Sequence, residues 1–309
     1  MRNTIAKVVS CRGVGLHSGR PVTMHVMPAA SGQGIVFRRT DVAPGEGEIP
    51  ARYDMVADAH LCTRLANRHG HSVGTVEHLM AALSGLGIND ATVALDGAEV
   101  PIMDGSSAGF VEAFSRVGVT AQRGDARALR ILKPVELRDG DRLAALTPAH
   151  RFSIAFDIDF AERAIGRQSI ELEMTGQAFQ SELADCRTFG CLSEVEQLRK
   201  LGLGLGGNLD NAIVVEGDRV LNPEGLRRTD EFVRHKALDA VGDLALAGAP
   251  IIGRYVGVKA GHDMTNRLLR KLFDTPDAWA LTPLPEWSMR LAPRPLQMHP
   301  ARTREAVAV

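Results

Sequence analysis

The sequence has few cysteines, no long apolar run and almost no net charge, and each of these features excludes a class of protein. Four cysteines occur among 309 residues and none forms a CxxC pair, which favours a reduced intracellular protein over a disulfide-stabilised secreted one. A run of roughly 18 apolar residues, as a membrane-spanning helix needs, is absent, and residues 1–19 lack the apolar centre of a signal peptide. The 36 basic residues are balanced by 37 acidic ones, without the basic excess typical of nucleic-acid-binding proteins. We therefore expect a cytoplasmic protein that binds no nucleic acid.

The rest of the composition is that of a globular protein large enough for two domains. Hydrophobic residues make up 45% of the chain and charged residues 24%, which is enough to build a hydrophobic core. The polar, aperiodic stretch 121–128 divides the chain, and each side combines short strands with about two helices. We predict an α+β protein with domains at residues 1–122 and 127–290. The proline- and arginine-rich residues 291–309 are expected to form a loosely ordered tail.

The segment "EFVRHKALDAVGDLAL", residues 231–246, has the spacing of an amphipathic helix. Its apolar face consists of Val233, Ala237, Ala240, Val241 and Leu244. His235, Asp239 and Asp243 follow one another at intervals of four residues on the other side, with Lys236 beside them. Because side chains four residues apart lie on one helix face, His235 and Asp239 are suited to bind one divalent ion. The alternative interpretation is a solvated ion pair on the surface.

The segment "TVEHLMAALSGLG", residues 75–87, supplies a third candidate ligand. It is predicted to form a helix capped by Thr75, with Glu77 and His78 off the apolar stripe in the first turn. An adjacent glutamate and histidine are typical of metallohydrolases, in which histidine binds zinc and glutamate activates a water molecule. The alternative is an acid that stabilises the helix start beside a surface histidine.

Two histidines and one carboxylate, His78, His235 and Asp239, match a catalytic zinc site with an open coordination position. His262 follows a glycine turn at the start of the last predicted helix, where it is either a general acid or cation or simply a helix cap. The glycine-rich residues 201–211 do not join a strand to a helix within a βαβ unit, so we do not interpret them as a dinucleotide site.

Seven motifs occur in an order that resembles one enzyme family over residues 5–275. They are "GVGLHSG", "TVEHLMAALSGLGI", "PIMDGSSA", "RTFG", "LGGNLDNAIVV", "DEFVRHKALDAVGDL" and "GHDMTNRLL". Their combination resembles the bacterial UDP-3-O-acyl-N-acetylglucosamine deacetylases of lipid A biosynthesis. The resemblance implies two α+β domains of like topology, packed as a sandwich with helices between the sheets and the site at the domain junction. It also implies Zn²⁺ bound by His78, His235 and Asp239.

The resemblance further implies roles for five residues. Glu77 would be the general base, and His262 the acid or electropositive partner, oriented by Asp243. Thr188 would help to hold the oxyanion, and Lys236 would face the anionic part of the substrate. The implied reaction is hydrolysis of the 2-acetamido group of UDP-3-O-(3-hydroxyacyl)-N-acetylglucosamine, an early committed step of lipid A biosynthesis. The residue types leave open whether Glu77 or His262 protonates the leaving amine.

Residues 186–215 are predicted to form a β-α-β insert, with a capping box at Ser193 and Glu196. The alternatives are a unit that packs on its own domain and a passage for the fatty acyl chain, and the resemblance favours the passage. Its expected lining is Phe189, Val195, Ala212 and Val214. Gly204 in this segment and His60 earlier in the chain depart from the family pattern, which bears on the preferred acyl chain.

Two rival functions remain at this point. One is a zinc hydrolase acting on another acylated sugar or amide, and the other is a binding protein that has lost its activity. The presence of Glu77 and His262 beside the three candidate ligands argues against the second. The expected partner is the small UDP-linked sugar alone, and the expected oligomeric state is a monomer.

Overall fold

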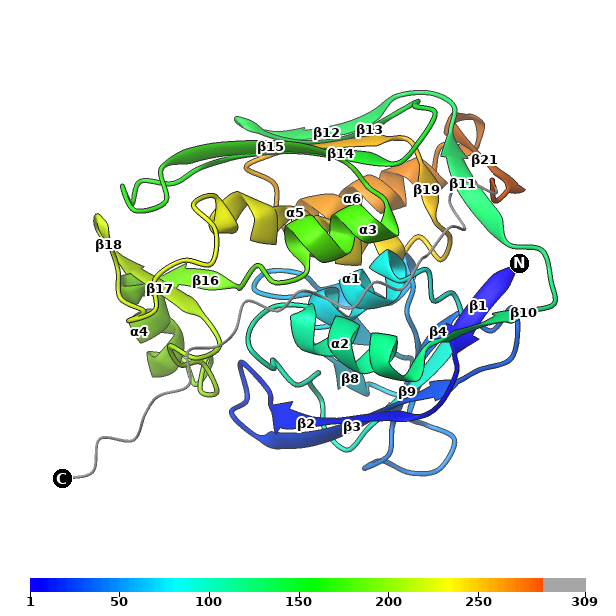
Figure 1. The fold of residues 1–309 in the computed structure, drawn as a ribbon, viewed down its shortest axis with the longest axis horizontal. Helices are drawn as coiled ribbons and strands as arrows, with labels where there is room; N and C mark the ends of the chain where they lie inside the picture. Colours follow the sequence, from blue (N-terminus) through cyan, green and yellow to red (C-terminus); the bar gives the residue numbers. More distant parts are fainter. Residues whose placement is uncertain (286–309) are drawn as a thin grey trace.

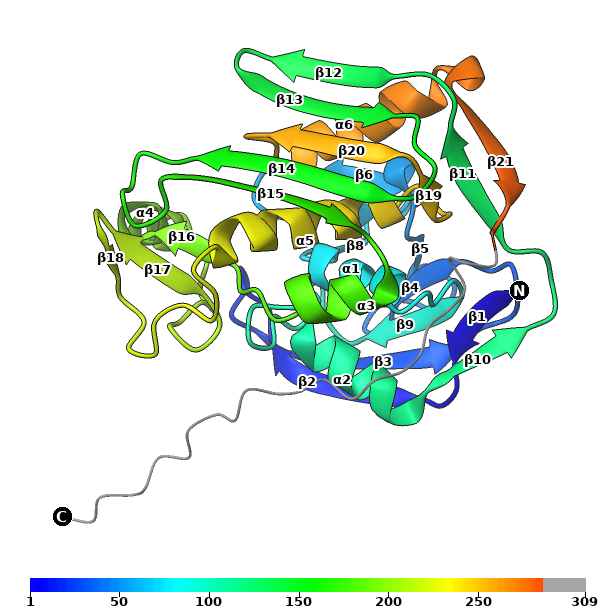
Figure 2. The same cartoon turned by 45° about the horizontal axis from the view of Figure 1, so that its top comes forward.

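Two five-stranded sheets form the outer layers of the protein, and helices lie between them (Figure 1). The computed structural model describes residues 1–285. The strands of the amino-terminal sheet, in spatial order, are β2 (Val9–Val14), β3 (Pro21–Pro28), β9 (Ala91–Leu95), β4 (Ile35–Arg39) and β5 (Glu48–Pro50). The strands of the carboxy-terminal sheet, in spatial order (Figure 2), are β12 (Val135–Asp139), β13 (Arg142–Thr147), β20 (Arg254–Val258), β14 (Ser153–Asp159) and β15 (Arg167–Glu173).

The two sheets have the same topology. In each, the third strand along the chain is parallel to the last, β4 to β9 and β14 to β20, and the other neighbours are antiparallel. A central helix precedes the last strand, α1 (Glu77–Gly85) or α5 (Glu231–Ala245), and another helix follows it, α2 (Ala108–Val117) or α6 (His262–Phe273). This repetition confirms the predicted α+β sandwich of two like-built domains. The boundaries at residues 122 and 127 stay a prediction.

Shorter elements complete the described chain. Their bounds are β1 (Arg2–Ile5), η1 (Tyr53–Met55), β6 (Val56–Asp58), β7 (Arg64–Ala66), β8 (Ser72–Val73), β10 (Val119–Gln122), β11 (Arg127–Ile131), α3 (Gly176–Ala178), η2 (Phe179–Leu183), β19 (Ile251–Ile252), η3 (Pro276–Ala278) and β21 (Trp279–Pro283). The expected linker 121–128 is shorter than predicted, because β10 and β11 extend into it from both sides. The tail predicted at residues 291–309 lies outside the described residues. Within residues 1–285, no helix is both long and apolar enough to cross a bilayer.

The predicted β-α-β insert projects from one end of the sandwich (Figure 1). It consists of β16 (Phe189–Cys191), α4 (Leu192–Lys200) and β17 (Ile213–Glu216), followed by β18 (Arg219–Val220). The parallel pairing of β16 with β17 confirms the predicted unit. The capping box is wrong by two residues: α4 begins at Leu192, and the Glu194 carboxylate accepts a hydrogen bond from the Cys191 amide at 3.5 Å.

The start of α1 also differs from the prediction. Thr75 does not cap the helix: its φ is 55°, and its hydroxyl instead donates to Glu99 Oε1 at 3.0 Å. The N-cap residue is Val76, so Glu77 and His78 are the first two residues of α1. Both side chains are buried, because this end of the helix packs against α5 rather than facing solvent.

Helix α5 is buried on nearly every side. The predicted apolar face is buried, and so is the polar row of His235, Asp239 and Asp243. The cause is the layer arrangement: α1, α6 and strands β14 and β15 all pack against α5. A polar row that would be solvated on a surface helix is therefore enclosed between the two halves of the protein.

Gly242 permits the close approach of α5 and α1. A Cβ at this position would lie 2.0 Å from the Glu77 backbone oxygen. An alanine in a helix interior is ordinarily more favourable than glycine by about 1 kcal/mol. We nevertheless expect Gly242→Ala to lower the free energy of unfolding by about 1–3 kcal/mol, because the backbone of α1 must move. Urea unfolding monitored by circular dichroism measures the change.

Gly109 in α2 is the matched control for this substitution. A Cβ there would lie 3.4 Å from the flexible end of Met103 and meet no backbone atom. Gly109→Ala should leave the free energy of unfolding unchanged or raise it. Equal destabilisation by both substitutions would contradict the steric explanation.

Candidate active site

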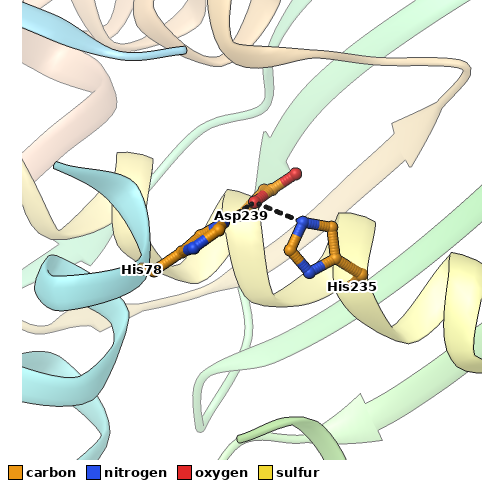
Figure 3. Close-up of side chains that lie close together, drawn as sticks. All are labelled: His78, His235 and Asp239. Carbon is orange, nitrogen blue, oxygen red and sulfur yellow. Dashed lines mark ion pairs between the residues drawn. The ribbon is translucent and has the colours of Figure 1, made fainter. Parts of the chain in front are cut away.

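Three side chains from the two central helices converge between the halves of the protein (Figure 3). His78 extends from α1, and His235 and Asp239 extend from adjacent turns of α5. Asp239 Oδ1 lies 3.4 Å from His78 Nε2 and 3.3 Å from His235 Nε2. One ligand atom of each residue lies within 4.8 Å of the other two. The structure thus brings together the three candidate metal ligands that the sequence suggested.

The surroundings keep His235 neutral and Asp239 ionised, which are the forms that bind a metal ion. Burial lowers the pKa of His235 to about 3, so its imidazole is neutral, and its Nδ1 lies 3.0 Å from the Cys186 carbonyl oxygen. That contact leaves Nε2 as the nitrogen that faces the cluster. Burial also opposes ionisation of Asp239, but the charge of Lys236 beside it helps to hold the pKa of this carboxyl well below its usual range.

One oxygen of Asp239 indicates that the cluster fits a cation. Oδ1 is buried and accepts no hydrogen bond from any residue in the described part of the chain. Buried polar atoms are nearly always satisfied, so an ionised oxygen facing two imidazole nitrogens calls for a positive partner. Two histidines and one carboxylate are a donor set that divalent zinc accepts.

Three further titratable groups border the cluster. His262 Nδ1 lies 2.8 Å from Asp243 Oδ2, and its Nε2 lies 3.7 Å from Glu77 Oε1. The N-terminal position of His262 on α6 confirms the predicted helix start and aims the ring at α5 and α1. Glu77, His262 and Asp243 thus form one chain of contacts that ends beside the candidate metal ligands.

The pKa values of Glu77 and His262 are both raised, but for different reasons. Burial raises the pKa of Glu77 above its ordinary value, which makes this carboxylate a stronger base near neutral pH. Burial would lower the pKa of His262, but the negative charges of Asp243 and Glu77 outweigh it and raise the pKa to about 9. At neutral pH His262 therefore carries a proton that it is able to donate.

Thr63 belongs to this group and was missed in the sequence analysis. Its amide donates to Glu77 Oε2 at 3.0 Å, and its hydroxyl donates to Asp243 Oδ1 at 2.5 Å. The residue precedes β7 and is fully buried. No local signal could have identified it, because Asp243 lies 180 residues away in the sequence.

A cleft of about 450 Å³ opens onto the cluster. Its lining includes Glu77, His78, His235, Asp239 and His262 together with Thr188, Phe189, Lys236, His60 and Phe160. Val195, Ala212 and Val214, predicted for the acyl passage, are not among the residues that line it.

Contacts from both halves of the protein hold Thr188 at the edge of this cleft. The Thr188 amide donates to the Gly105 carbonyl at 2.8 Å, which ties the insert to the amino-terminal half. The preceding Arg187 is buried and donates from Nε to Glu231 Oε1 at 2.9 Å, at the start of α5. The hydroxyl predicted to hold the oxyanion therefore belongs to a segment fixed at two points.

Lys236 has a partner that the sequence did not predict. Its Nζ donates to Asp239 Oδ2 at 2.8 Å. Burial would lower the pKa of Lys236, but the attraction of Asp239 outweighs it and raises the pKa above its ordinary value. The ammonium group is therefore charged and lies next to the candidate metal ligands at the cleft.

A buried cluster with the donor set of a metal centre, flanked by a carboxylate base and a protonated histidine, defines the protein as a hydrolase. Comparison with known proteins identifies the type. The chain belongs to the family of UDP-3-O-acyl N-acetylglycosamine deacetylases, whose model matches residues 2–274.

Relatives with an assigned name agree with this family. A UDP-3-O-acyl-N-acetylglucosamine deacetylase of Phenylobacterium zucineum is 52% identical over 278 residues, which cover 90% of this chain and 95% of the relative. The proteins of the same name from Myxococcus xanthus and Shewanella frigidimarina are 48% and 45% identical over 282 residues. These alignments cover 91% of this chain and 89% and 92% of the two relatives. The resemblance inferred from the seven motifs is thereby confirmed.

Proposed function

We propose that the protein hydrolyses the 2-acetamido group of UDP-3-O-(3-hydroxyacyl)-N-acetylglucosamine to acetate and the free amine. The observation that carries the proposal is the buried cluster of His78, His235 and Asp239 beside Glu77 and His262 at the base of the cleft. The names of the relatives support this substrate. The four cysteines are unpaired, which supports action in a reducing cytoplasm.

We propose zinc as the cation that His78, His235 and Asp239 would hold. When bound, it would polarise the amide carbonyl and lower the pKa of a water molecule. The remaining chemistry belongs to the side chains. Glu77, with its raised pKa, removes a proton from the attacking water.

The tetrahedral intermediate then needs a donor for its oxygen and a proton for its nitrogen. The Thr188 hydroxyl is proposed to donate to the oxyanion, a contact of the kind that typically contributes about 3 kcal/mol to the transition state. His262 has a raised pKa and is oriented by Asp243, so it is suited to protonate the leaving amine. Glu77, once it has gained the proton of the water, is the second candidate for this step.

The acyl chain is proposed to leave the cleft along the insert. Phe189 lines the cleft at this side and makes edge-to-face contacts with Phe160 and Phe232, with ring centroids 5.5 and 5.0 Å apart. Phe160 and Phe189, which both line the cleft, offer an apolar wall next to the polar cluster, and Phe232 is fully buried. Val195, Ala212 and Val214 remain predicted contacts for a part of the chain beyond this wall.

Substitution of Lys236 tests the proposed contact with the anionic part of the substrate. Lys236→Ala should raise KM by about tenfold or more and change kcat little, because a charged contact to the nucleotide acts in ground and transition states alike. Zinc content by elemental analysis is the necessary companion measurement. Loss of zinc with an unchanged KM would show that Lys236 serves only Asp239.

Acetate release from the UDP-sugar tests the function itself. Purified protein should release one acetate per free amine formed, lose this activity with a chelator and regain it with added zinc. A matched substrate without the 3-O-acyl chain should react more slowly, because it lacks the contacts of the insert. Turnover of other acetylated sugars with none of the UDP-sugar would point to a hydrolase of different specificity.

A further inference from the structure

Thr63 uses each of its polar groups in contacts around the active site. Its amide donates to Glu77 Oε2, its hydroxyl donates to Asp243 Oδ1, and its carbonyl accepts from the Val76 amide at 3.3 Å. Only 1% of the residue is exposed. One residue of the amino-terminal half thus holds a carboxylate from each of the two central helices.

The contact with Glu77 determines which of its oxygens is available. Because the Thr63 amide occupies Oε2, Oε1 is the oxygen that faces His262, at 3.7 Å from Nε2. A carboxylate held by a backbone donor cannot rotate freely, which keeps its second oxygen directed into the cleft. This contact survives substitution of the Thr63 side chain.

The contact with Asp243 acts on the reaction through His262, which Asp243 orients. With Oδ1 bound to the Thr63 hydroxyl, Oδ2 is left to accept from His262 Nδ1 at 2.8 Å. Both oxygens are then engaged, so the plane of the carboxylate is fixed and with it the direction of the imidazole ring. Asp243 and His262 lie on α5 and α6 of the carboxy-terminal half, whereas Thr63 approaches from the other half.

We infer that Thr63 is a positioning residue for the reaction: its hydroxyl orients the Asp243–His262 pair while its amide orients Glu77. The inference rests on the proposed deacetylase function. Thr63 itself touches no reacting atom, and it acts through Glu77, which takes a proton from water, and His262, which gives one to the leaving amine. Its contacts also fix the position of Glu77 in the amino-terminal half relative to Asp243 in the carboxy-terminal half.

Thr63→Val removes the hydroxyl, preserves the amide contact and leaves Asp243 Oδ1 buried without its donor. We expect kcat to fall by about 10- to 100-fold, because a hydrogen bond to a charged group is lost from the catalytic arrangement. KM and zinc content should stay within about threefold of the wild type, because no substrate contact or ligand is removed. Thr63→Ser, which keeps the hydroxyl, should restore most of kcat.

A double-mutant cycle separates positioning from general stability. If Thr63 acts through Asp243, Thr63→Val should have little further effect on kcat in an Asp243→Ala background. Thr4→Val is the matched control, because Thr4, in β1, is also buried, and its hydroxyl donates to the Asp90 carbonyl away from the cleft. It should lower the unfolding temperature without changing kcat.

Several outcomes would overturn the inference. These are an equal loss of kcat in the wild-type and Asp243→Ala backgrounds, a serine variant as slow as the valine variant, or an effect on KM alone. If the valine variant does not fold, Thr63→Ala replaces it in the same cycle. Wild-type acetate release is measured in parallel, and its absence would refute the proposed function rather than the role of Thr63.

Discussion

Replacement of His235 or Asp239 by alanine is expected to remove most of the bound zinc and lower kcat/KM by about a thousandfold or more. Each residue provides one of three ligand atoms that lie within 4.8 Å of one another. A two-ligand site retains neither the affinity nor the geometry of a catalytic centre. Elemental analysis and acetate release from the same preparations provide the two measurements, and His78→Ala should behave in the same way.

His60→Ala is the control for zinc content. His60 lines the same cleft but lies outside the three-ligand cluster, so its removal should leave one zinc per chain. Full zinc occupancy in two of the three ligand variants would refute the assignment of the metal site.

Glu77→Gln should lower kcat by about 10²- to 10⁴-fold while zinc stays bound, because the amide keeps the shape of the side chain but cannot take a proton. The effect should appear in kcat and kcat/KM together, as expected for an interaction made in the transition state. The initial rate of acetate release at saturating substrate measures kcat. Turnover near the wild-type value would assign the activation of water to another group.

Glu99→Gln is a control within the same half of the protein. Glu99 is also buried, but its oxygens accept from the amides of His17 and Ser18 and from the Thr75 hydroxyl. This substitution should lower the free energy of unfolding and leave the zinc content unchanged. A large loss of kcat without loss of stability would show that the effect of Glu77→Gln is not specific to the base.

The pH dependence of kcat/KM should show an alkaline limb that belongs to His262. The charges of Asp243 and Glu77 raise the pKa of His262 to about 9 in the protein without a metal. A bound divalent cation would lower this value by repulsion, so activity should fall as the pH rises through a midpoint at or below about 9. His262→Gln should abolish this limb, and persistence of the limb in that variant would assign it to another group.

The parts of the site that rest on local spacing were predictable from the sequence. His235 and Asp239 lie on one helix, so their proximity follows from the helical repeat alone. The addition of His78 came from an adjacent Glu–His pair and from the family resemblance, since nothing in the spacing joins α1 to α5.

Contacts between distant segments were not predictable in this way. The hydrogen bond from Thr63 to Asp243 depends on how the two halves pack, and a threonine just before a short strand gives no sign of it. The burial of the polar row on α5 has the same origin. The predicted cap at Thr75 was wrong because the Thr75 hydroxyl donates to Glu99 instead of to the start of the helix. This tertiary contact overrides the local preference of threonine for capping.

The division of the candidate ligands between α1 and α5 would couple metal binding to the docking of the two halves. A cation bound by His78 from one half and by His235 and Asp239 from the other acts as a cross-link that exists only in the folded protein. By mass action, zinc at a hundred times its dissociation constant would raise the free energy of unfolding by about 2.7 kcal/mol. Loss of zinc in the cell would then expose the chain to proteolysis as well as silence it, so the supply of the metal would set the abundance of the protein together with its activity.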